Sequence, residues 1–344
     1  MKEVFIELNV PPEDAEICAD ILIQSDLRGI ESHGCQRLKM YYDRIVQGIQ
    51  SPTTKLTIKK ETATTARIDA GHGMGHVAAY RAMELAIKKA NEFGIGAISV
   101  GNSTHFGIAG YYSLMAVKEG MIGITCTNAR PSIAPTFGVD AMLGTNPLTI
   151  GIPTDEEFPF LIDCATSITQ RGKVEVIARK KTPVPQGWVI NNKGELATDS
   201  EQILKDLIAG TSALLPLGGA GEILGGHKGY GYATAVEILS AALSDGPFMK
   251  DLTLSKGYKL GHFFLAINVE NFLPLSTFKK ISGSILRQLR ASTKAPGQER
   301  IYTAGEKEYF AEIEHKKSGI PIMPSILADL RFLQKELDLP DYQF

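Results

Sequence analysis

The chain has 344 residues, of which 44% are hydrophobic and 22% charged, values typical of a globular protein with enough chain for a large core. Its 36 basic and 38 acidic residues leave a formal charge of −2, and no run of Lys and Arg is long enough for a nucleic-acid-binding stripe. This balance favours a small molecule as partner and predicts no nucleic-acid partner.

The four cysteines are scattered without a C-x-x-C pair or a metal-like spacing, which is typical of reduced thiols in a cytosolic protein. The sequence contains no stretch of about 18 consecutive apolar residues, and its first residues lack the apolar centre of a signal peptide. We therefore expect a cytoplasmic protein with no membrane partner and no metal site.

The first sixty residues predict a helical segment. Apolar residues recur at helical spacing from Ala15 to Leu22. A second helix is expected to begin after Ser32, which suits an N-cap, and to run through Ile45 before Gly48 ends it.

His33 and Arg37 stand four residues apart in this second helix and should share one of its faces. An imidazole, with a pKa of about 6.5, can move a proton near neutral pH. A guanidinium group can hold a carboxylate by two parallel hydrogen bonds. The alternative is a partly buried histidine beside a solvated arginine, and for the isolated pair that alternative is favoured until other stretches are considered.

Strand, glycine-rich turn and helix follow one another around residues 71–76, which invites a comparison with the Rossmann fingerprint. That fingerprint needs glycine at position 76, where the chain has His76. The next strand ends in Gly101 rather than in an acid for the ribose. The fingerprint is absent, and the turn is better explained as a connection between a strand and the helix that ends at Gly94.

Strands at 95–100 and 121–127 alternate with a helix at 107–118, which predicts an α/β domain. The polar loop 101–107 follows the carboxyl end of the first of these strands, where ligands often bind in such sheets. His105 in this loop is a second candidate site residue, and the alternative is that it caps the next helix or satisfies a backbone carbonyl.

A proline- and glycine-rich stretch at 128–153 predicts a long structured loop. The apolar run 158–162 after it ends in Asp163, Cys164, Ala165, Thr166 and Ser167. Asp163 is placed to orient a histidine or to hold a sugar hydroxyl. The alternative is that it caps the following helix.

The second half of the chain predicts a hairpin at 186–194, a short helix at 203–208 and a glycine-rich loop at 218–231 that leads into a helix at 233–243. The loop contains His227 and Lys228, and its N–H groups could meet a phosphate, although it lacks the Walker pattern. A strand at 262–268, a helix at 275–290, and helix and short strand in the last seventy residues complete the prediction.

Several of these stretches together resemble the non-Rossmann family of malate/L-lactate dehydrogenases, which includes enzymes for sulfolactate, ureidoglycolate, diketogulonate and cyclic imino acids. The matching stretches run in the family's order over nearly the whole chain, most like the archaeal-type malate dehydrogenases. They are Asp26-Leu27-Arg28-Gly29, Ser32-His33-Gly34 with Arg37, Asn102-Ser103-Thr104-His105-Phe106-Gly107, Gly144-Thr145-Asn146-Pro147, Asp163-Cys164-Ala165-Thr166-Ser167 with Gly172-Lys173, Gly226-His227-Lys228-Gly229-Tyr230-Gly231, Gly305-Glu306 and Gly319-Ile320-Pro321.

The resemblance implies an α/β (α+β) fold in which a mixed sheet flanked by helices binds a nicotinamide cofactor without a Rossmann domain. It implies a helical N-terminal segment (1–60), a cofactor-binding domain (61–270) and a C-terminal segment (271–344) that packs with the N-terminal part. It also implies a homodimer, with NAD as cofactor and NADP as an alternative. The cofactor contacts would be Phe160, Leu161, Ile162, Asp163, Cys164, Ala165, Thr166, His227, Lys228, Gly305 and Glu306.

By the same resemblance, His33 is the proton donor and acceptor in hydride transfer between the cofactor and a 2-hydroxy or 2-oxo acid. Arg37 would anchor the substrate carboxylate, with Ser32 and His105 as further substrate contacts. Asp163 either pairs with a histidine or binds the cofactor, and the residues leave both open. Malate/oxaloacetate is the expected substrate, with L-lactate, L-sulfolactate and ureidoglycolate as alternatives.

Two other classes of protein are alternatives. His72 and His76 are four residues apart with Asp69 nearby, which would suit a metal-dependent hydrolase, but the His-Glu-x-x-His pattern is missing. A non-catalytic cofactor-binding protein would keep the fold without turnover. The presence of both His33 and Arg37 argues against it.

Overall fold

The computed structural model describes residues 1–253 and 257–342, and the chain forms two compact units that are described separately. The first unit comprises Met1–Thr125, Thr149–Asp163 and Phe264–Phe344, and the second comprises Cys126–Leu148 and Cys164–Phe263. Each unit is thus assembled from segments that are distant in sequence. The division into 1–60, 61–270 and 271–344 made from the sequence stays a prediction.

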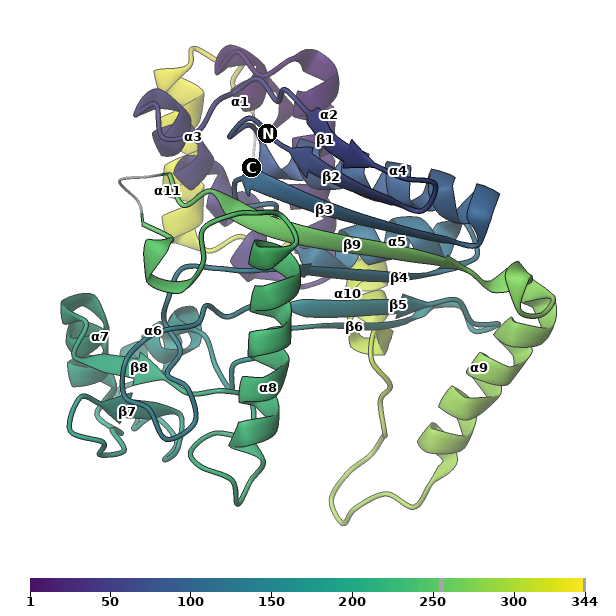
Figure 1. The fold of residues 1–344 in the computed structure, drawn as a ribbon. Coiled ribbons are helices and arrows are strands. Elements are labelled where there is room, and N and C mark those ends of the chain that lie inside the picture. Colours follow the sequence, from purple (N-terminus) through teal and green to yellow (C-terminus); the bar gives the residue numbers. More distant parts are fainter. Residues whose placement is uncertain (254–256, 343–344) are drawn as a thin grey trace. The chain divides into compact units, whose positions relative to one another are not determined.

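A seven-stranded mixed sheet with strand order β1-β2-β3-β9-β4-β5-β6 organises the fold (Figure 1). β1 pairs antiparallel with β2, and β2 pairs parallel with β3. The mixed sheet flanked by helices confirms the predicted fold class. The strands are β1 (Thr57–Glu61), β2 (Thr65–Asp69), β3 (Ile95–Ser103), β4 (Met121–Thr127), β5 (Leu148–Ile152), β6 (Phe160–Cys164) and β9 (Leu260–Asn268).

The helices α2 (Pro12–Leu27), α4 (Gly75–Phe93) and α5 (Ala109–Lys118) pack against β2, β3 and β9, and Figure 1 shows α4 and α5 behind the sheet. Their contact face is rich in alanine, so helix and strand backbones approach closely. A Cβ atom at Gly96 would lie 2.0 Å from the Ala86 carbonyl oxygen. This close packing buries a large core cluster, and α4 ends at the left-handed Gly94 as predicted.

A second core of the first unit joins the two ends of the chain. Phe5, Leu22 and Tyr41 from the N-terminal helices pack with Leu330 and Leu333 of the last helix. The remaining helices of this unit are α1 (Lys2–Glu7), α3 (Leu38–Val46), α9 (Leu275–Ala291), α10 (Glu306–Ser318) and α11 (Pro324–Glu336), with a 3₁₀ turn at Val269–Asn271.

The second unit has its own core around Ile133, Val174, Ile203 and Leu214. The predicted hairpin turn is confirmed, because the Gly194 N–H donates to the Asn191 carbonyl at 3.0 Å. The elements here are α6 (Arg171–Arg179), β7 (Val189–Asn191), α7 (Ser200–Ala209), β8 (Ser212–Leu214), α8 (Gly226–Glu237), a π turn (Ile238–Ala242) and a 3₁₀ turn (Met249–Asp251).

The helix expected to begin after Ser32 begins instead at Leu38, and the chain before it makes two 3₁₀ turns, 31–33 and 35–37. The break has a local cause. Gly34 has non-helical angles (φ −89°, ψ −143°), and the Asp26 carboxylate accepts the Cys35 N–H at 2.7 Å. Ser32 makes no capping hydrogen bond, so its predicted role as N-cap is wrong.

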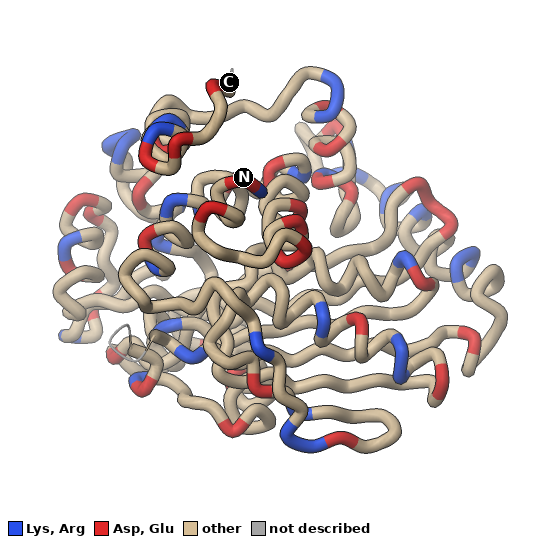
Figure 2. The backbone as a smooth tube through the Cα atoms, turned by 90° about the horizontal axis from the view of Figure 1, so that it is seen from above, with Lys and Arg blue, Asp and Glu red and all other residues tan. Residues whose placement is uncertain are grey.

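Three further expectations differ from the structure. The expected loop 128–153 contains β5, and α8 begins at Gly226, seven residues before the predicted start. The last seventy residues contain helices and no strand within the described part of the chain. Basic and acidic residues alternate in short stretches along the backbone (Figure 2). None of the helices described has the length and apolarity needed to cross a bilayer.

Candidate active site

Two histidines from distant segments meet in the first unit. The His33 and His105 rings stack with centroids 5.5 Å apart and an interplanar angle of 17°. Ser32 Oγ lies 2.8 Å from His33 Nδ1, and Arg37 Nε donates to the Ser32 carbonyl at 2.7 Å. The structure therefore brings together the four residues assigned to proton transfer and substrate binding, although on turns rather than on one helix.

The backbone at Gly34 makes this arrangement possible. A Cβ atom there would lie 1.7 Å from Asp26 Oδ1, so a side chain at this position would collide with the carboxylate that holds the turn. Asp26 is buried on α2, and burial raises the pKa of its carboxyl. α2 thus fixes the turn that carries His33.

Tyr41 and His76 extend the cluster, and neither was singled out as a site residue from the sequence. The Tyr41 hydroxyl lies 2.6 Å from His105 Nδ1, and its ring meets His76 edge-on with centroids 4.7 Å apart. Tyr41 follows Arg37 by four residues, a spacing that could have indicated it. The sequence pattern suggests His76 only as a metal ligand.

Burial keeps these imidazoles neutral at pH 7. It lowers the pKa of His33 to about 4, with the Arg37 guanidinium adding to the effect, and lowers the pKa of His76 to about 3. The pKa of His105 also falls well below its usual value, mainly through burial and then through His33 and Arg37. Histidine in this state is a proton acceptor.

Asp163 lies at the end of β6, and its Oδ2 accepts the Gly110 N–H in the first turn of α5 at 2.8 Å. Burial raises the pKa of its carboxyl to about 6, while the Gly110 bond and the Arg28 guanidinium oppose the rise. The alternative that Asp163 caps the following helix is wrong, because α6 begins after Gln170.

The strand β6 and the start of α10 lie side by side, which brings residues 160–163 together with Gly305 and Glu306. The Leu161 N–H donates to the Ala304 carbonyl at 3.2 Å. Gly305 has φ +90°, and a Cβ atom there would lie 3.0 Å from the Pro159 carbonyl oxygen. Only glycine fits this close crossing without strain.

The Glu306 side chain is fully buried and already bonded. Its carboxylate accepts the Thr303 N–H at 3.0 Å, pairs with Arg300, and lies 3.6 Å from an Arg290 nitrogen. These partners hold the pKa of the carboxyl below its usual value despite burial. Glu306 therefore fixes the start of α10, and any contact of its carboxylate with a ligand would require these bonds to rearrange.

In the second unit, Thr166 is anchored to the loop 144–147, because its hydroxyl donates to the Asn146 carbonyl at 2.9 Å. Cys164 and Ala165, just before it, are partly buried. His227 and Lys228 are exposed on the first turn of α8, whose N-cap is the left-handed Gly225.

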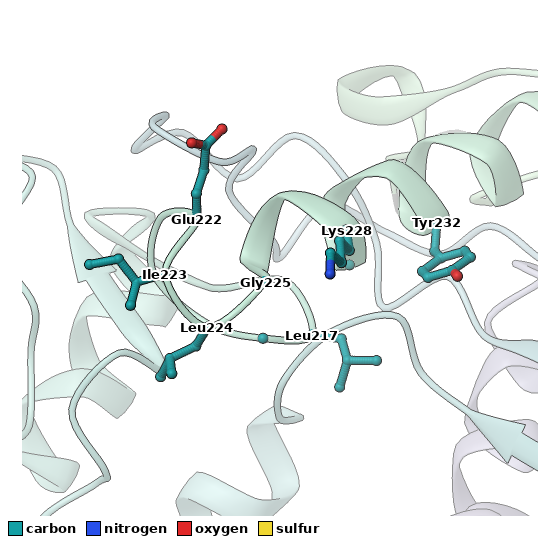
Figure 3. Close-up of a pocket in the computed structure, with 9 residues that line it drawn as sticks. Leu217, Glu222, Ile223, Leu224, Gly225, Lys228 and Tyr232 are labelled. Carbon is teal, nitrogen blue, oxygen red and sulfur yellow. The ribbon is translucent and has the colours of Figure 1, made fainter.

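An open pocket of about 440 Å³ lies at this end of α8 (Figure 3). Its apolar lining includes Leu217, Ile223 and Leu224, and Lys228 and Tyr232 line it from the helix. A helix N-terminus with a nearby lysine attracts anions, while the apolar lining suits a flat ring.

Comparison with known proteins decides the family. The family model described as malate/L-lactate dehydrogenase matches residues 1–331. The chain belongs to the malate/L-lactate dehydrogenase family. It is similar to the malate dehydrogenase of Pyrococcus horikoshii, with 46% identity over 97% of this chain and 92% of that protein. It is also similar to the L-sulfolactate dehydrogenase of Methanocaldococcus jannaschii, with 37% identity over 98% and 94%.

Solved structures agree with this assignment. The malate dehydrogenase from Entamoeba histolytica superposes with a TM-score of 0.96 and 44% identity, covering 100% of this chain and 96% of that one. The structure from Pyrococcus horikoshii gives a TM-score of 0.90. The predicted family and the predicted oxidoreductase class are confirmed, and membership implies a nicotinamide cofactor.

The residues present fit such a cofactor. A dinucleotide carries two phosphates and flat rings, and the N-terminus of α8 with Lys228 and its apolar pocket offers groups of that chemistry. In the first unit, the backbone at Gly305 crosses the start of β6 without an intervening side chain. Neither feature depends on the Rossmann fingerprint, which the sequence lacks.

The structure gives no support to a metal-dependent hydrolase. Within residues 1–253 and 257–342, no group of three or more His, Cys, Asp or Glu side chains lies close enough to hold a metal ion. His72 Nε2 lies 2.6 Å from the Ile49 carbonyl oxygen, and His76 faces Tyr41. His72, His76 and Asp69 are therefore not gathered into a ligand set.

Proposed function

We propose that this family member is a malate dehydrogenase, which transfers hydride between malate and a nicotinamide cofactor. The observation that carries the proposal is the stacked pair of neutral histidines beside Arg37. The naming of relatives at 46% and 47% identity as malate dehydrogenases supports the substrate. NAD is the proposed cofactor, with NADP as the alternative, and the cytoplasm is the proposed location.

When bound, the nicotinamide accepts or donates the hydride. The chain supplies the remaining chemistry. In oxidation, neutral His33 takes the proton from the substrate's 2-hydroxyl as its carbon loses hydride. A pKa of about 4 leaves His33 ready for this role across neutral pH. In reduction His33 must carry a proton, and the bound dicarboxylate raises its proton affinity by opposite charge.

Arg37 orients the substrate in this proposal. Its Nε is used in the bond to the Ser32 carbonyl, so its terminal nitrogens are the ones positioned to hold the C1 carboxylate in a fork. Because the same Ser32 contacts His33, the carboxylate anchor and the proton acceptor are fixed relative to each other. Such fixed geometry lowers the entropic cost of reaching the reactive arrangement.

The cofactor contacts are proposed along residues 160–166, 227–228 and 305–306. Support comes from the crossing of the Gly305 segment over β6 in the first unit and from the anion-attracting end of α8 in the second. Asp163 already accepts a backbone N–H, so one of its oxygens is engaged by the protein. The remaining oxygen is proposed to meet either the cofactor or a histidine.

A homodimer is proposed because the first unit leaves an apolar face uncovered. Ile281, Ile285 and Leu289 recur every fourth residue along α9, and these residues are 53–55% exposed. One helix face with this pattern suits burial against a second copy of the chain. Sedimentation of the wild type and of Ile285→Glu tests this, because the charged variant should dissociate while retaining its fold.

The test of the activity is NADH oxidation by purified protein with oxaloacetate, pyruvate, sulfopyruvate and 2-oxoglutarate, repeated with NADPH. We expect the highest turnover with oxaloacetate. If turnover is highest with sulfopyruvate, the protein would instead be an L-sulfolactate dehydrogenase, like the relative from Methanocaldococcus jannaschii. Cofactor binding without turnover of any of these acids, or of ureidoglycolate in the oxidative direction, would contradict the proposed dehydrogenase chemistry.

A further inference from the structure

Tyr41 lies next to His105 and is buried among other aromatic rings. Its side chain is fully buried, its ring is tilted against Phe5 with centroids 6.1 Å apart, and it meets His76 edge-on. From this position its hydroxyl reaches His105 Nδ1 at 2.6 Å. Few rotations of the Tyr41 side chain are compatible with such packing, so the contact is well defined.

A second contact indicates which nitrogen of His105 carries the proton. The Gly107 backbone N–H points at the same Nδ1, with a distance of 3.4 Å. A backbone N–H can only donate a hydrogen bond, so this contact favours Nδ1 as the acceptor and a neutral ring with its proton on Nε2. The Tyr41 hydroxyl then donates to Nδ1 as well.

His33 is held differently. Its Nδ1 contacts the Ser32 hydroxyl at 2.8 Å, and a hydroxyl can either donate or accept. His33 can therefore gain or lose a proton while keeping this bond. A proton on Nδ1 of His105, in contrast, would face the Gly107 N–H directly. The two stacked rings therefore differ: His33 can change its protonation state and keep its hydrogen bond at Nδ1, whereas His105 cannot.

We propose that Tyr41 is a positioning residue that holds His105 in the Nε2–H form, so that His105 donates a hydrogen bond to the substrate while His33 alone exchanges the reaction's proton. In reduction, His33 releases one proton to the new 2-hydroxyl oxygen, and His105 keeps its own. In oxidation the proton returns to His33. The kinetic consequences of this inference rest on the proposed dehydrogenase function. The tautomer of His105 does not depend on it.

The surroundings of the pair support a fixed hydrogen bond instead of a proton relay. Burial raises the pKa of Tyr41 and lowers the pKa of His105, so both groups stay neutral and the proton remains on the phenol oxygen. The titratable groups whose charge acts on His105 are His33, Arg37, Arg44 and His76, and each of them disfavours a positive charge on the ring.

The direct test is nitrogen NMR of the protein labelled on histidine, with His105→Gln used to assign the resonance. We expect His105 to show a protonated Nε2 and an unprotonated Nδ1 in the wild type. A protonated Nδ1 would overturn the inference whether or not the protein turns over any substrate, so failure here and failure of the proposed function are distinguishable.

Tyr41→Phe tests the role of the hydroxyl, and Tyr42→Phe is the matched control because its hydroxyl bonds Glu336 instead. We expect Tyr41→Phe to lower kcat about fivefold, because one neutral hydrogen bond of roughly 1 kcal/mol favours the Nε2–H form of His105 by that factor. Its KM for the nucleotide should not change. Its pH profile should gain a titration, since His105 loses a donor that favours the neutral ring. Kinetics and pH profile equal to those of Tyr42→Phe would overturn the role of Tyr41.

Discussion

Acid should destabilise this protein through the histidine that the proposed chemistry does not use. His76 is fully buried, and burial lowers its pKa from 6.5 to about 3. Between these values the unfolded chain binds a proton that the folded chain does not. The contribution of His76 to stability is therefore complete above pH 6.5 and is lost as the pH falls toward 3.

The size of this loss follows from the two pKa values. At pH 5 the unfolded histidine is mostly protonated and the folded one is not, which costs about 2 kcal/mol of unfolding free energy. For a chain of this length, that corresponds to a change of roughly 3 °C in Tm. His76→Phe keeps a flat ring in the same place but removes the titration.

We expect the Tm of His76→Phe to fall less steeply than that of the wild type between pH 7.5 and pH 5, in thermal melts followed by circular dichroism. His227→Phe is the matched control, because His227 is exposed on α8 and its solvation changes little on folding. A pH dependence of Tm in His76→Phe as steep as in both the wild type and His227→Phe would refute the reasoning.

Three further predictions can be tested independently of one another. Gly34→Ala should lower both kcat and Tm, because the added Cβ would lie 1.7 Å from Asp26 Oδ1. Overpacking of this kind costs roughly 1–3 kcal/mol of unfolding free energy. Gly172→Ala is the control, since Gly172 has open space around it and the change should alter neither quantity. In the oxidative direction, kcat/KM should stay level from pH 8 to about pH 5 and fall as His33 protonates near pH 4; a fall centred near pH 6.5 would contradict the depressed pKa of His33. Glu306→Gln should raise the KM for the nucleotide severalfold without changing the pH profile. An unchanged KM would show that the bonds of the Glu306 carboxylate to Thr303, Arg290 and Arg300 do not position the cofactor.

Periodicity in the sequence was sufficient to predict most elements of the sheet and its covering helices. The alanine-rich face of α4, for example, repeats at helical spacing and ends at Gly94, and both features are local. β5 was missed because its apolar residues alternate with Thr149 and Gly151 directly after a proline, inside a stretch rich in turn residues.

The candidate site was predictable in composition but not in geometry. His33, Arg37 and His105 were all proposed from the sequence, yet the helix expected to carry the first two is interrupted. The interruption depends on the Asp26 carboxylate, which accepts a hydrogen bond from the N–H of Cys35, nine residues further along the chain. Local helix propensity carries no information about this contact. The Tyr41 contact with His105 spans 64 residues and arises only because α3 packs against the loop between β3 and α5.

The most direct test of the account compares wild type and His33→Ala in oxaloacetate reduction, together with a fluorescence titration of nucleotide binding. The account predicts that His33→Ala loses turnover by about 10² or more, the usual contribution of a general acid or base, while its nucleotide affinity stays that of the wild type. Near-normal turnover in His33→Ala would contradict the assignment of the proton to His33.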